Sequence, residues 1–224
     1  EVHVCNPFNI PSEWKKFRMG DYGFAKPSAV YWGATSPDGQ LYIYRELYVT
    51  GHTYSDLTDA IAAASPDHEV INYDIFDPAI WQKKGENDAG LCGAEIMQNR
   101  WREIHPITPS RPSMQRHLNL QKANNDRLQG WMALRGYLKP YHQEKQLTAK
   151  LQVFSTCTEL IRTLPSLIYD LHKVEDLDTD GEDHSGDQCR YKIKHLKWID
   201  AKLGGVRYNV RPDKRKATAI MIGH

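Results

Sequence analysis

Two aspartates in the last third of the sequence have a spacing that suits metal binding. Asp183 and Asp187 are four residues apart where a predicted helix of about residues 185–201 begins. That spacing places both side chains on one helix face. Like charges there repel, so the pair costs free energy unless a cation offsets it. Carboxylate oxygens suit Mg²⁺ or Mn²⁺ rather than zinc, so the pair predicts a site for one of these ions.

The residues before this pair are also acidic. From Asp170 to Asp187 the chain has eight acidic residues and one lysine, a net charge of −7 in a protein whose total is +1. A solvated acidic loop would have the same composition. The choice between a loop and a metal site therefore depends on acids elsewhere in the chain.

Asp21 and Asp77 each stand at the end of a predicted strand. Asp21 ends the strand of about residues 17–22, and the neighbouring Gly20 and Gly23 leave space beside the backbone for a metal. Asp77 follows the strand predicted for residues 69–76, just before Pro78. Taken singly, the first is an ordinary turn residue and the second an ordinary helix cap.

Asp74 competes with Asp77 for the role of second acid. Asp74 lies inside the strand, where alternation places it on the same face as Phe76. Asp77 is at the C-terminal edge, where α/β proteins usually bind ligands. The sequence does not decide between the two, and Asp77 is our prediction.

Together these acids predict a hydrolytic site with two metal ions. Asp21, Asp77 and Asp183 are the predicted catalytic residues and metal ligands, with Asp187 as either a fourth ligand or a partner of one. Two ions about 4 Å apart, one activating water and one stabilising the leaving oxygen, hydrolyse phosphodiesters.

A basic segment follows the acidic one directly. From Arg190 to Lys216 there are ten basic residues and two acids, a net charge of +8. This division suits a polyanion held by cations over an acid-bound metal. The candidates for contacts to a DNA backbone, which are equally compatible with plain surface charge, are Lys26, Arg207, Arg211, Lys214 and Arg215.

Length and composition are those of an ordinary globular protein. The chain has 224 residues, of which 40% are hydrophobic and 25% charged. No apolar run approaches the roughly 18 residues of a membrane span, and no secretory signal opens the chain. Its four cysteines lack the paired spacing of zinc sites, so we expect free thiols.

Hydrophobic periodicity predicts a mixed α/β sheet. An antiparallel meander comes first, and strands then alternate with helices. Strands are predicted over residues 17–22, 28–35, 40–49, 69–76 and 151–154, and helices over 53–64, 89–98, 122–138, 158–171 and 185–201, with a loop or edge strand over 102–112. We expect one domain over residues 1–224, with 1–16 as a linker leading into it and 203–224 as a basic C-terminal segment.

Several ordered motifs resemble the nuclease domain of the large terminase subunit, the DNA-packaging motor of tailed double-stranded DNA phages. Asp21-Tyr22-Gly23 resembles the first catalytic aspartate of that family, and the segment from Asp77 to Trp81 resembles the second. The acidic residues 175–183, followed by Asp187 and residues 188–191, resemble the third acidic motif. Residues 125–131 and 156–165 are also typical of the family.

This resemblance implies an RNase H-like fold and an endonuclease, dependent on two Mg²⁺ or Mn²⁺ ions, that cuts concatemeric viral DNA during packaging. It also implies double-stranded DNA, the portal and the small terminase subunit as partners, in the host cytoplasm and without a membrane. The family's large subunit has an ATPase domain with a Gly-Lys-Ser/Thr phosphate loop, which this sequence lacks. We therefore expect the nuclease half of such a motor.

Two other functions remain open at this stage. One is another RNase H-like nuclease, such as a resolvase or transposase, although those lack the motifs of residues 156–165 and 175–180. The other is a mainly non-catalytic docking module of the packaging motor. Cleavage by the isolated domain would argue against a purely passive role.

Overall fold

The computed structural model describes residues 2–83, 90–106, 118–123, 127–143 and 146–170, and within them all side chains except those of 127–132 and 166–170. Seven strands in these ranges form one mixed sheet in the order β1-β9-β4-β3-β2-β5-β6. The central three, β2, β3 and β4, are antiparallel, and every other pairing is parallel. The strands are β1 (Val4–Cys5), β2 (Lys15–Asp21), β3 (Ser28–Thr35), β4 (Leu41–Val49), β5 (Tyr73–Phe76), β6 (Leu120–Lys122) and β9 (Leu151–Phe154).

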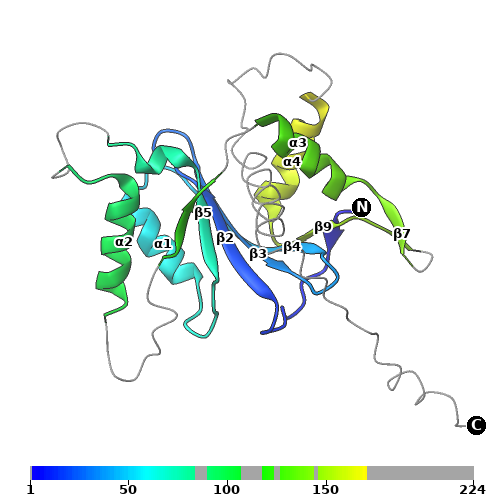
Figure 1. The fold of residues 1–224 in the computed structure, drawn as a ribbon, viewed down its shortest axis with the longest axis horizontal. Coiled ribbons are helices and arrows are strands. Elements are labelled where there is room, and N and C mark those ends of the chain that lie inside the picture. Colours follow the sequence, from blue (N-terminus) through cyan, green and yellow to red (C-terminus); the bar gives the residue numbers. More distant parts are fainter. Residues whose placement is uncertain (1, 84–89, 107–117, 124–126, 144–145, 171–224) are drawn as a thin grey trace, which may run out of the picture.

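Helices cover both faces of this sheet. Figure 1 shows α1 and α2 on one side and α3 and α4 on the other. A two-stranded hairpin of β7 and β8 lies outside the main sheet. The bounds are α1 (Tyr54–Ala64), η1 (Pro78–Trp81, a 3₁₀ turn), α2 (Gly93–Ile104), α3 (Arg127–Leu138), α4 (Thr158–Asp170), β7 (Tyr141–Gln143) and β8 (Gln146–Thr148).

The core is densest around the central strands. Residues of β2 and β3 are buried almost throughout, because each strand has a neighbour on both sides and helices above and below. The largest fully buried side chains include Trp32, Tyr31 and Phe17. Gly33 faces the Phe17 ring, and a Cβ there would lie 2.1 Å from Phe17 Cζ, so the close packing requires glycine. The strands that bear Asp21 and Asp77 are thus fixed by the core.

Helix starts are held by specific carboxylates. Thr53 caps α1, and Asp56 accepts a hydrogen bond from the Thr53 backbone amide in return. At α4 the carboxylate comes from a distant strand. Glu46 of β4 accepts hydrogen bonds from the amides of Glu159 (2.9 Å) and Leu160 (3.0 Å). This anion at a helix N-terminus ties α4 to the sheet.

Most sequence-based expectations for the fold are confirmed. The meander of β2, β3 and β4 is present, and its second turn has a positive φ at Gly39 (84°). Helix α1 begins after its cap Thr53, close to the predicted start, β9 matches its predicted range, and Pro165 lies inside α4. Cys5, Cys92 and Cys157 are free thiols, while Cys189 lies outside the described residues.

Three predicted elements differ from the observed ones by several residues at one or both ends. The strand predicted for residues 69–76 begins only at Tyr73, because the Glu69 side chain instead bonds Tyr44 and Arg45 of β4. The helix predicted for 89–98 runs from Gly93 to Ile104, since Cys92 is its cap, and this overturns the loop expected at 102–104. The helix predicted from 122 starts at Arg127, and residue 122 belongs to β6.

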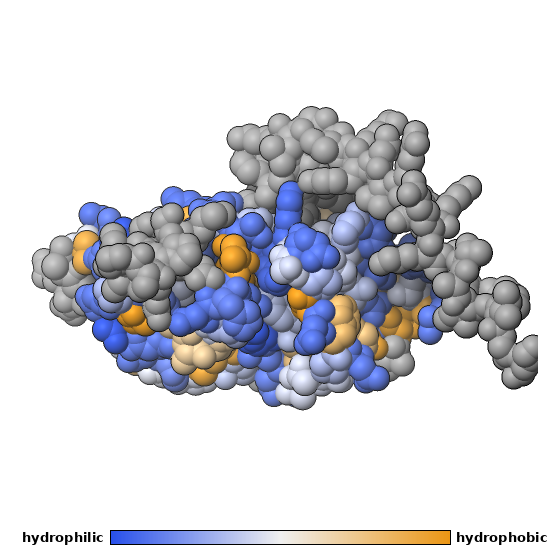
Figure 2. Space-filling view, turned by 90° about the horizontal axis from the view of Figure 1, so that it is seen from below, coloured by the Kyte–Doolittle hydropathy of each residue, from blue (hydrophilic) through white to orange (hydrophobic). Residues whose placement is uncertain are grey.

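The first residues also join the sheet. Val4 and Cys5, within the range expected to lead into the domain, pair in parallel with Val153 and Phe154. Among the described residues no helix is both long and apolar enough to cross a membrane. On the face in Figure 2, hydrophobic residues form separate patches among hydrophilic ones.

Candidate metal and catalytic site

Asp21 and Asp77 lie at the ends of two neighbouring parallel strands. Gly20 of β2 pairs with Phe76 of β5, and the two aspartates are the next residue on each strand. The Asp77 amide donates to the Gly20 carbonyl oxygen over 3.2 Å, which continues the pairing one step past β5. Because adjacent strands are about 4.8 Å apart, the two backbones meet at the same edge of the sheet.

Both aspartates belong to the same face of the sheet. Residues two apart on a strand share a face, so Asp21 follows Phe17 and Met19, and Asp77 follows Tyr73 and Ile75. The rings of Phe17 and Tyr73 stack at 6.0 Å between centroids, which shows that these two series are on one side. The sequence pattern placed the acids at strand ends, and the register brings them together.

Asp74 faces the opposite side and is already bonded. Its Oδ1 accepts a hydrogen bond from Arg18 Nε at 2.5 Å, and its Oδ2 accepts one from the Asn119 amide at 2.9 Å. Asp74 is 1% exposed and Arg18 2%. Arg18 also donates to Ser65 Oγ (3.0 Å) and lies over the Trp101 ring. Both oxygens of Asp74 thus bond structural partners, Arg18 of β2 and the residue before β6, while Asp77 stays our predicted second acid.

The Asp77 side chain has a local structural role as well. Its Oδ1 accepts a hydrogen bond from the Ala79 amide at 2.7 Å, and Pro78 opens the 3₁₀ turn η1. This is the helix-cap role that its sequence context suggested. The bond fixes the orientation of the carboxylate at the edge of the sheet.

Gly20 makes room for the ring beside Asp77. A Cβ on Gly20 would lie 2.3 Å from Cε1 of Phe76, so the ring occupies the space of the missing side chain. The sequence predicts that this glycine leaves space for a metal. The described contact is with Phe76, on the face opposite Asp21.

A compact turn after Asp21 positions Lys26. The Ser28 hydroxyl accepts from the Gly23 amide (3.1 Å) and donates to the Gly23 carbonyl oxygen (2.7 Å). A Cβ on Gly23 would lie 2.4 Å from the Lys26 carbonyl oxygen, so this turn also requires glycine. Lys26 is exposed on this turn, beside the strand end that bears Asp21.

Two tyrosines brace the same edge. Tyr22 stacks on Tyr54 of α1 with 3.8 Å between ring centroids, and Tyr54 in turn packs against Gly93 at the start of α2. Burial, together with Tyr22 and Cys92, raises the pKa of Tyr54 to about 12. Burial and Asp56 also raise the pKa of Tyr22. Both rings therefore stay protonated at neutral pH, and their role is to position the chain after Asp21.

One basic residue near this edge, Lys122, is not among the residues predicted to contact DNA. Lys122 pairs with Phe76 at the end of β6, and its Nζ lies 5.6 Å from the centre of the Trp81 ring. Lys122 begins the helix predicted for residues 122–138, whereas in the structure it ends strand β6. The three-residue run of β6 is too short to show strand periodicity, so the sequence offered little signal for it.

The two carboxylates that the structure describes at this edge, Asp21 and Asp77, are suitable ligands for a hard divalent cation. Asp21 and Asp77 supply carboxylate oxygens from adjacent strand ends, and such oxygens are the ligands that Mg²⁺ and Mn²⁺ prefer. Within the described ranges there is no group of three or more His, Cys, Asp or Glu residues that could hold a metal. The other predicted site residues lie outside those ranges: Asp183, Asp187, Arg207, Arg211, Lys214 and Arg215.

Comparisons with known proteins identify the fold. No protein-family model and no curated protein sequence matches the chain. Among solved structures, the nuclease domain of the P22 large terminase matches with a TM-score of 0.54 and 15% identity, covering 88% of each chain. The large terminase of a thermophilic bacteriophage matches with a TM-score of 0.59 and 19% identity. That match covers 88% of this chain but only 43% of the phage protein.

The fold is therefore that of terminase nuclease domains, an RNase H-like α/β fold. The central strand order β4-β3-β2-β5-β6, with only β3 reversed, places Asp21 and Asp77 on adjacent strands. The resemblance that the sequence motifs indicated is confirmed at the level of structure.

Proposed function

We propose that this protein is the nuclease of a phage DNA-packaging motor, a metal-dependent endonuclease that cuts concatemeric double-stranded viral DNA. The observation that supports this best is the placement of Asp21 and Asp77 side by side, on one face, at one edge of a sheet with the terminase nuclease fold. That edge is where α/β sheets commonly bind ligands.

In this proposal Asp21, Asp77 and Asp183 hold two Mg²⁺ or Mn²⁺ ions, with Asp187 as a fourth ligand or a partner of one. When bound, these ions supply an activated water and stabilise the leaving oxygen of the phosphodiester. Asp21 lies on the central strand β2, and in this proposal it would be a ligand of both ions. Asp77, fixed by its bond to the Ala79 amide, would hold one of them.

Basic residues would hold the DNA backbone. Lys26 is exposed on the turn after Asp21, and we assign it a phosphate contact. Arg207, Arg211, Lys214 and Arg215 are proposed as further contacts from the basic C-terminal segment. Such contacts fix the position of the duplex without reading its sequence.

The remaining partners follow from the longer relative. The chain spans 43% of the length of the thermophilic-phage terminase, structures of which contain ADP or ATP-gamma-S. We infer that this nuclease works with an ATPase domain in the full-length protein. The portal, the small terminase subunit and the host cytoplasm complete the proposed setting.

A plasmid cleavage assay tests the proposal. Supercoiled plasmid is incubated with the protein in Mg²⁺, Mn²⁺ or EDTA, beside the variants Asp21→Asn, Asp77→Asn and Asp183→Ala. We expect nicking and linearisation only with metal, and a loss of at least about 100-fold in each variant while circular dichroism spectra stay unchanged. Retained cleavage by a folded Asp21→Asn protein would rule out the assigned site. No cleavage by the folded wild type would favour the docking role instead.

A further inference from the structure

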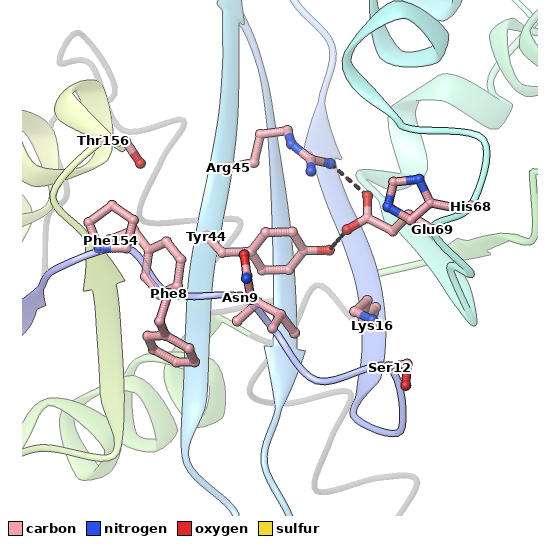
Figure 3. Close-up of a pocket in the computed structure, with 12 residues that line it drawn as sticks. Phe8, Asn9, Ser12, Lys16, Tyr44, Arg45, His68, Glu69, Phe154 and Thr156 are labelled. Carbon is pink, nitrogen blue, oxygen red and sulfur yellow. Dashed lines mark hydrogen bonds and ion pairs between the residues drawn. The ribbon is translucent and has the colours of Figure 1, made fainter.

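A second site lies away from the two aspartates, where the N-terminal segment crosses the sheet. The cavity there has a volume of about 440 Å³, within the range of small-molecule sites, roughly 300–1,000 Å³. Strands β2 and β4, the loop before β5 and residues 7–12 all contribute to its wall. Figure 3 shows Tyr44 at its centre, with Phe8 and Phe154 on one side and Lys16, His68 and Glu69 on the other.

The acid in this cavity is already satisfied. Glu69 Oε1 accepts a hydrogen bond from the Tyr44 hydroxyl at 2.9 Å, and Oε2 accepts one from Arg45 Nη1 at 2.6 Å. Arg45 therefore offsets the charge of Glu69. Burial and Glu69 raise the pKa of Tyr44 well above its usual value, so the hydroxyl remains a donor. The Glu69 group is a fixed part of the wall.

Lys16 also lines this cavity and contributes a cationic side chain. The residue is only 8% exposed, yet within the described ranges its ammonium group has no ion pair and no hydrogen bond. Its one hydrogen bond to a side chain runs from the backbone amide to Asn72 Oδ1. The ammonium nitrogen is not among the fully buried polar atoms without a hydrogen-bond partner, so it keeps contact with solvent and is open to a bound anion. Because Lys16 lines the cavity, an anion there would meet it directly.

The opposite wall is aromatic. The rings of Phe8 and Phe154 are 4.9 Å apart, and Phe8 remains 43% exposed. A flat ring placed against Phe8 would bury this surface, and aromatic contacts of that kind stabilise by about 0.5–1.5 kcal/mol beyond the buried area. The cavity thus has a cationic side and an aromatic side that are separated by Tyr44 (Figure 3).

We propose that this cavity binds a small ligand that combines a flat ring with a phosphate or carboxylate, of which a nucleoside monophosphate is one type. The anionic group would pair with Lys16 and the ring would lie against Phe8. Lys16 is on the sheet face opposite Asp21 and five residues away along β2, about 16 Å at about 3.3 Å per residue. The site is therefore separate from the proposed nuclease centre and does not depend on it.

Isothermal titration calorimetry in EDTA tests the inference without any contribution from metal or cleavage. Deoxythymidine monophosphate is titrated beside thymidine, inorganic phosphate and benzoate. We expect the monophosphate to bind and the first two controls to bind at least tenfold more weakly, because each lacks one half of the ligand. Benzoate distinguishes the two kinds of anion: if it binds better than the monophosphate, the ligand is a carboxylate.

Two variants and one matched control locate the binding. Lys16→Met should weaken binding at least tenfold, whereas Lys15→Met, the exposed neighbour on the opposite sheet face, should leave it unchanged. Ser12→Trp fills the cavity from its exposed rim without touching the core, and it should also abolish binding. Thermal melts confirm that each variant is folded. Undiminished binding in folded Lys16→Met and Ser12→Trp, or no binding of either anion to the wild type at millimolar concentration, would overturn the proposal.

Discussion

The amide of Asp77 donates a hydrogen bond to the carbonyl oxygen of Gly20, 3.2 Å away. This bond extends the pairing of β2 and β5 beyond the last residue of β5. It sets Asp77 next to Asp21 rather than one residue out of register. A shift of one residue would move one of the aspartates to the other face of the sheet.

Substitution of Asp74 and of Asp77 should affect the stability of the protein to different extents. Asp74→Asn removes the charge that pairs with buried Arg18, so we expect a loss of about 3–5 kcal/mol in the free energy of unfolding. Asp77→Asn keeps an oxygen to accept from the Ala79 amide, so its stability should stay within about 1 kcal/mol of the wild type. Urea denaturation measures both changes.

The two substitutions should have the opposite order of effect on DNA cleavage, with Asp77→Asn the more damaging. Asp77→Asn should be inactive although folded, and Asp74→Asn should cut DNA at any temperature where it remains folded. A folded but inactive Asp74→Asn protein, beside an active Asp77→Asn protein, would reverse our assignment of the second acid.

Gly20→Ala should disturb the candidate site through Phe76. The added Cβ would lie 2.3 Å from the ring, which is 1% exposed and has no space to retreat. Overpacking of this kind costs about 1–3 kcal/mol, and the displaced ring would also shift Asp77. Thermal melts and cleavage rates should fall together, and adding Phe76→Leu should recover part of both.

A matched control for this substitution is Gly136→Ala in α3, where nothing lies within 4 Å of the new Cβ. There the change should stabilise by roughly 0.5–1 kcal/mol, as expected for an exposed helix interior. Equal effects at the two glycines would show that the contact with Phe76 is unimportant.

Stability near α2 should depend on pH through Glu95. Its carboxylate accepts from the Cys92 amide at 2.8 Å, and these bonds to Cys92 lower its pKa below the ordinary 4.5. Because the folded-state pKa is the lower one, the stabilisation is present above about pH 4.5 and is lost as the pH falls through the folded-state value. Glu95→Gln should therefore lower the melting temperature at pH 7 and have less effect near pH 3. A constant difference across that range would argue against the cap.

Cys157 should resist alkylation in the native protein. Burial and the nearby Glu46 raise the pKa of its thiol to about 12, and the side chain is fully buried. The thiolate is the reactive form, so iodoacetamide at pH 8 should modify Cys157 only after denaturant is added. Peptide mass spectrometry follows the reaction, with the partly exposed Cys5 as an internal comparison. Rapid modification of Cys157 without denaturant would contradict the described packing.

Long amphipathic and β-rich segments were predictable from the sequence, because their periodicity is a local property. The meander of β2, β3 and β4 and helix α1 are examples. Short strands were not. The two residues of β1 and the three of β6 pair with strands far along the chain, and no local pattern marks them.

The start of helix α2 was predicted wrongly for a related reason. Cys92 is an uncommon cap residue, so the start of α2 was misplaced, although Glu95 three residues later was an available signal. Local sequence could not decide either whether Asp74 or Asp77 is the second acid of the candidate site. The choice depends on Arg18, which lies 56 residues before Asp74 and bonds it only once β2 and β5 are paired.

The pairing of β1 with β9 bears on the order in which the chain assembles. Val4 can find Val153 only after nearly the whole described sequence has been synthesised. Contacts this distant in sequence slow folding, because the chain loses loop entropy before it gains the contact. The meander can form from its own local turns, so β1 should dock late, after β9 has joined β4. On the ribosome, β1 would emerge before the other described strands of this sheet and yet be among the last of them to enter it.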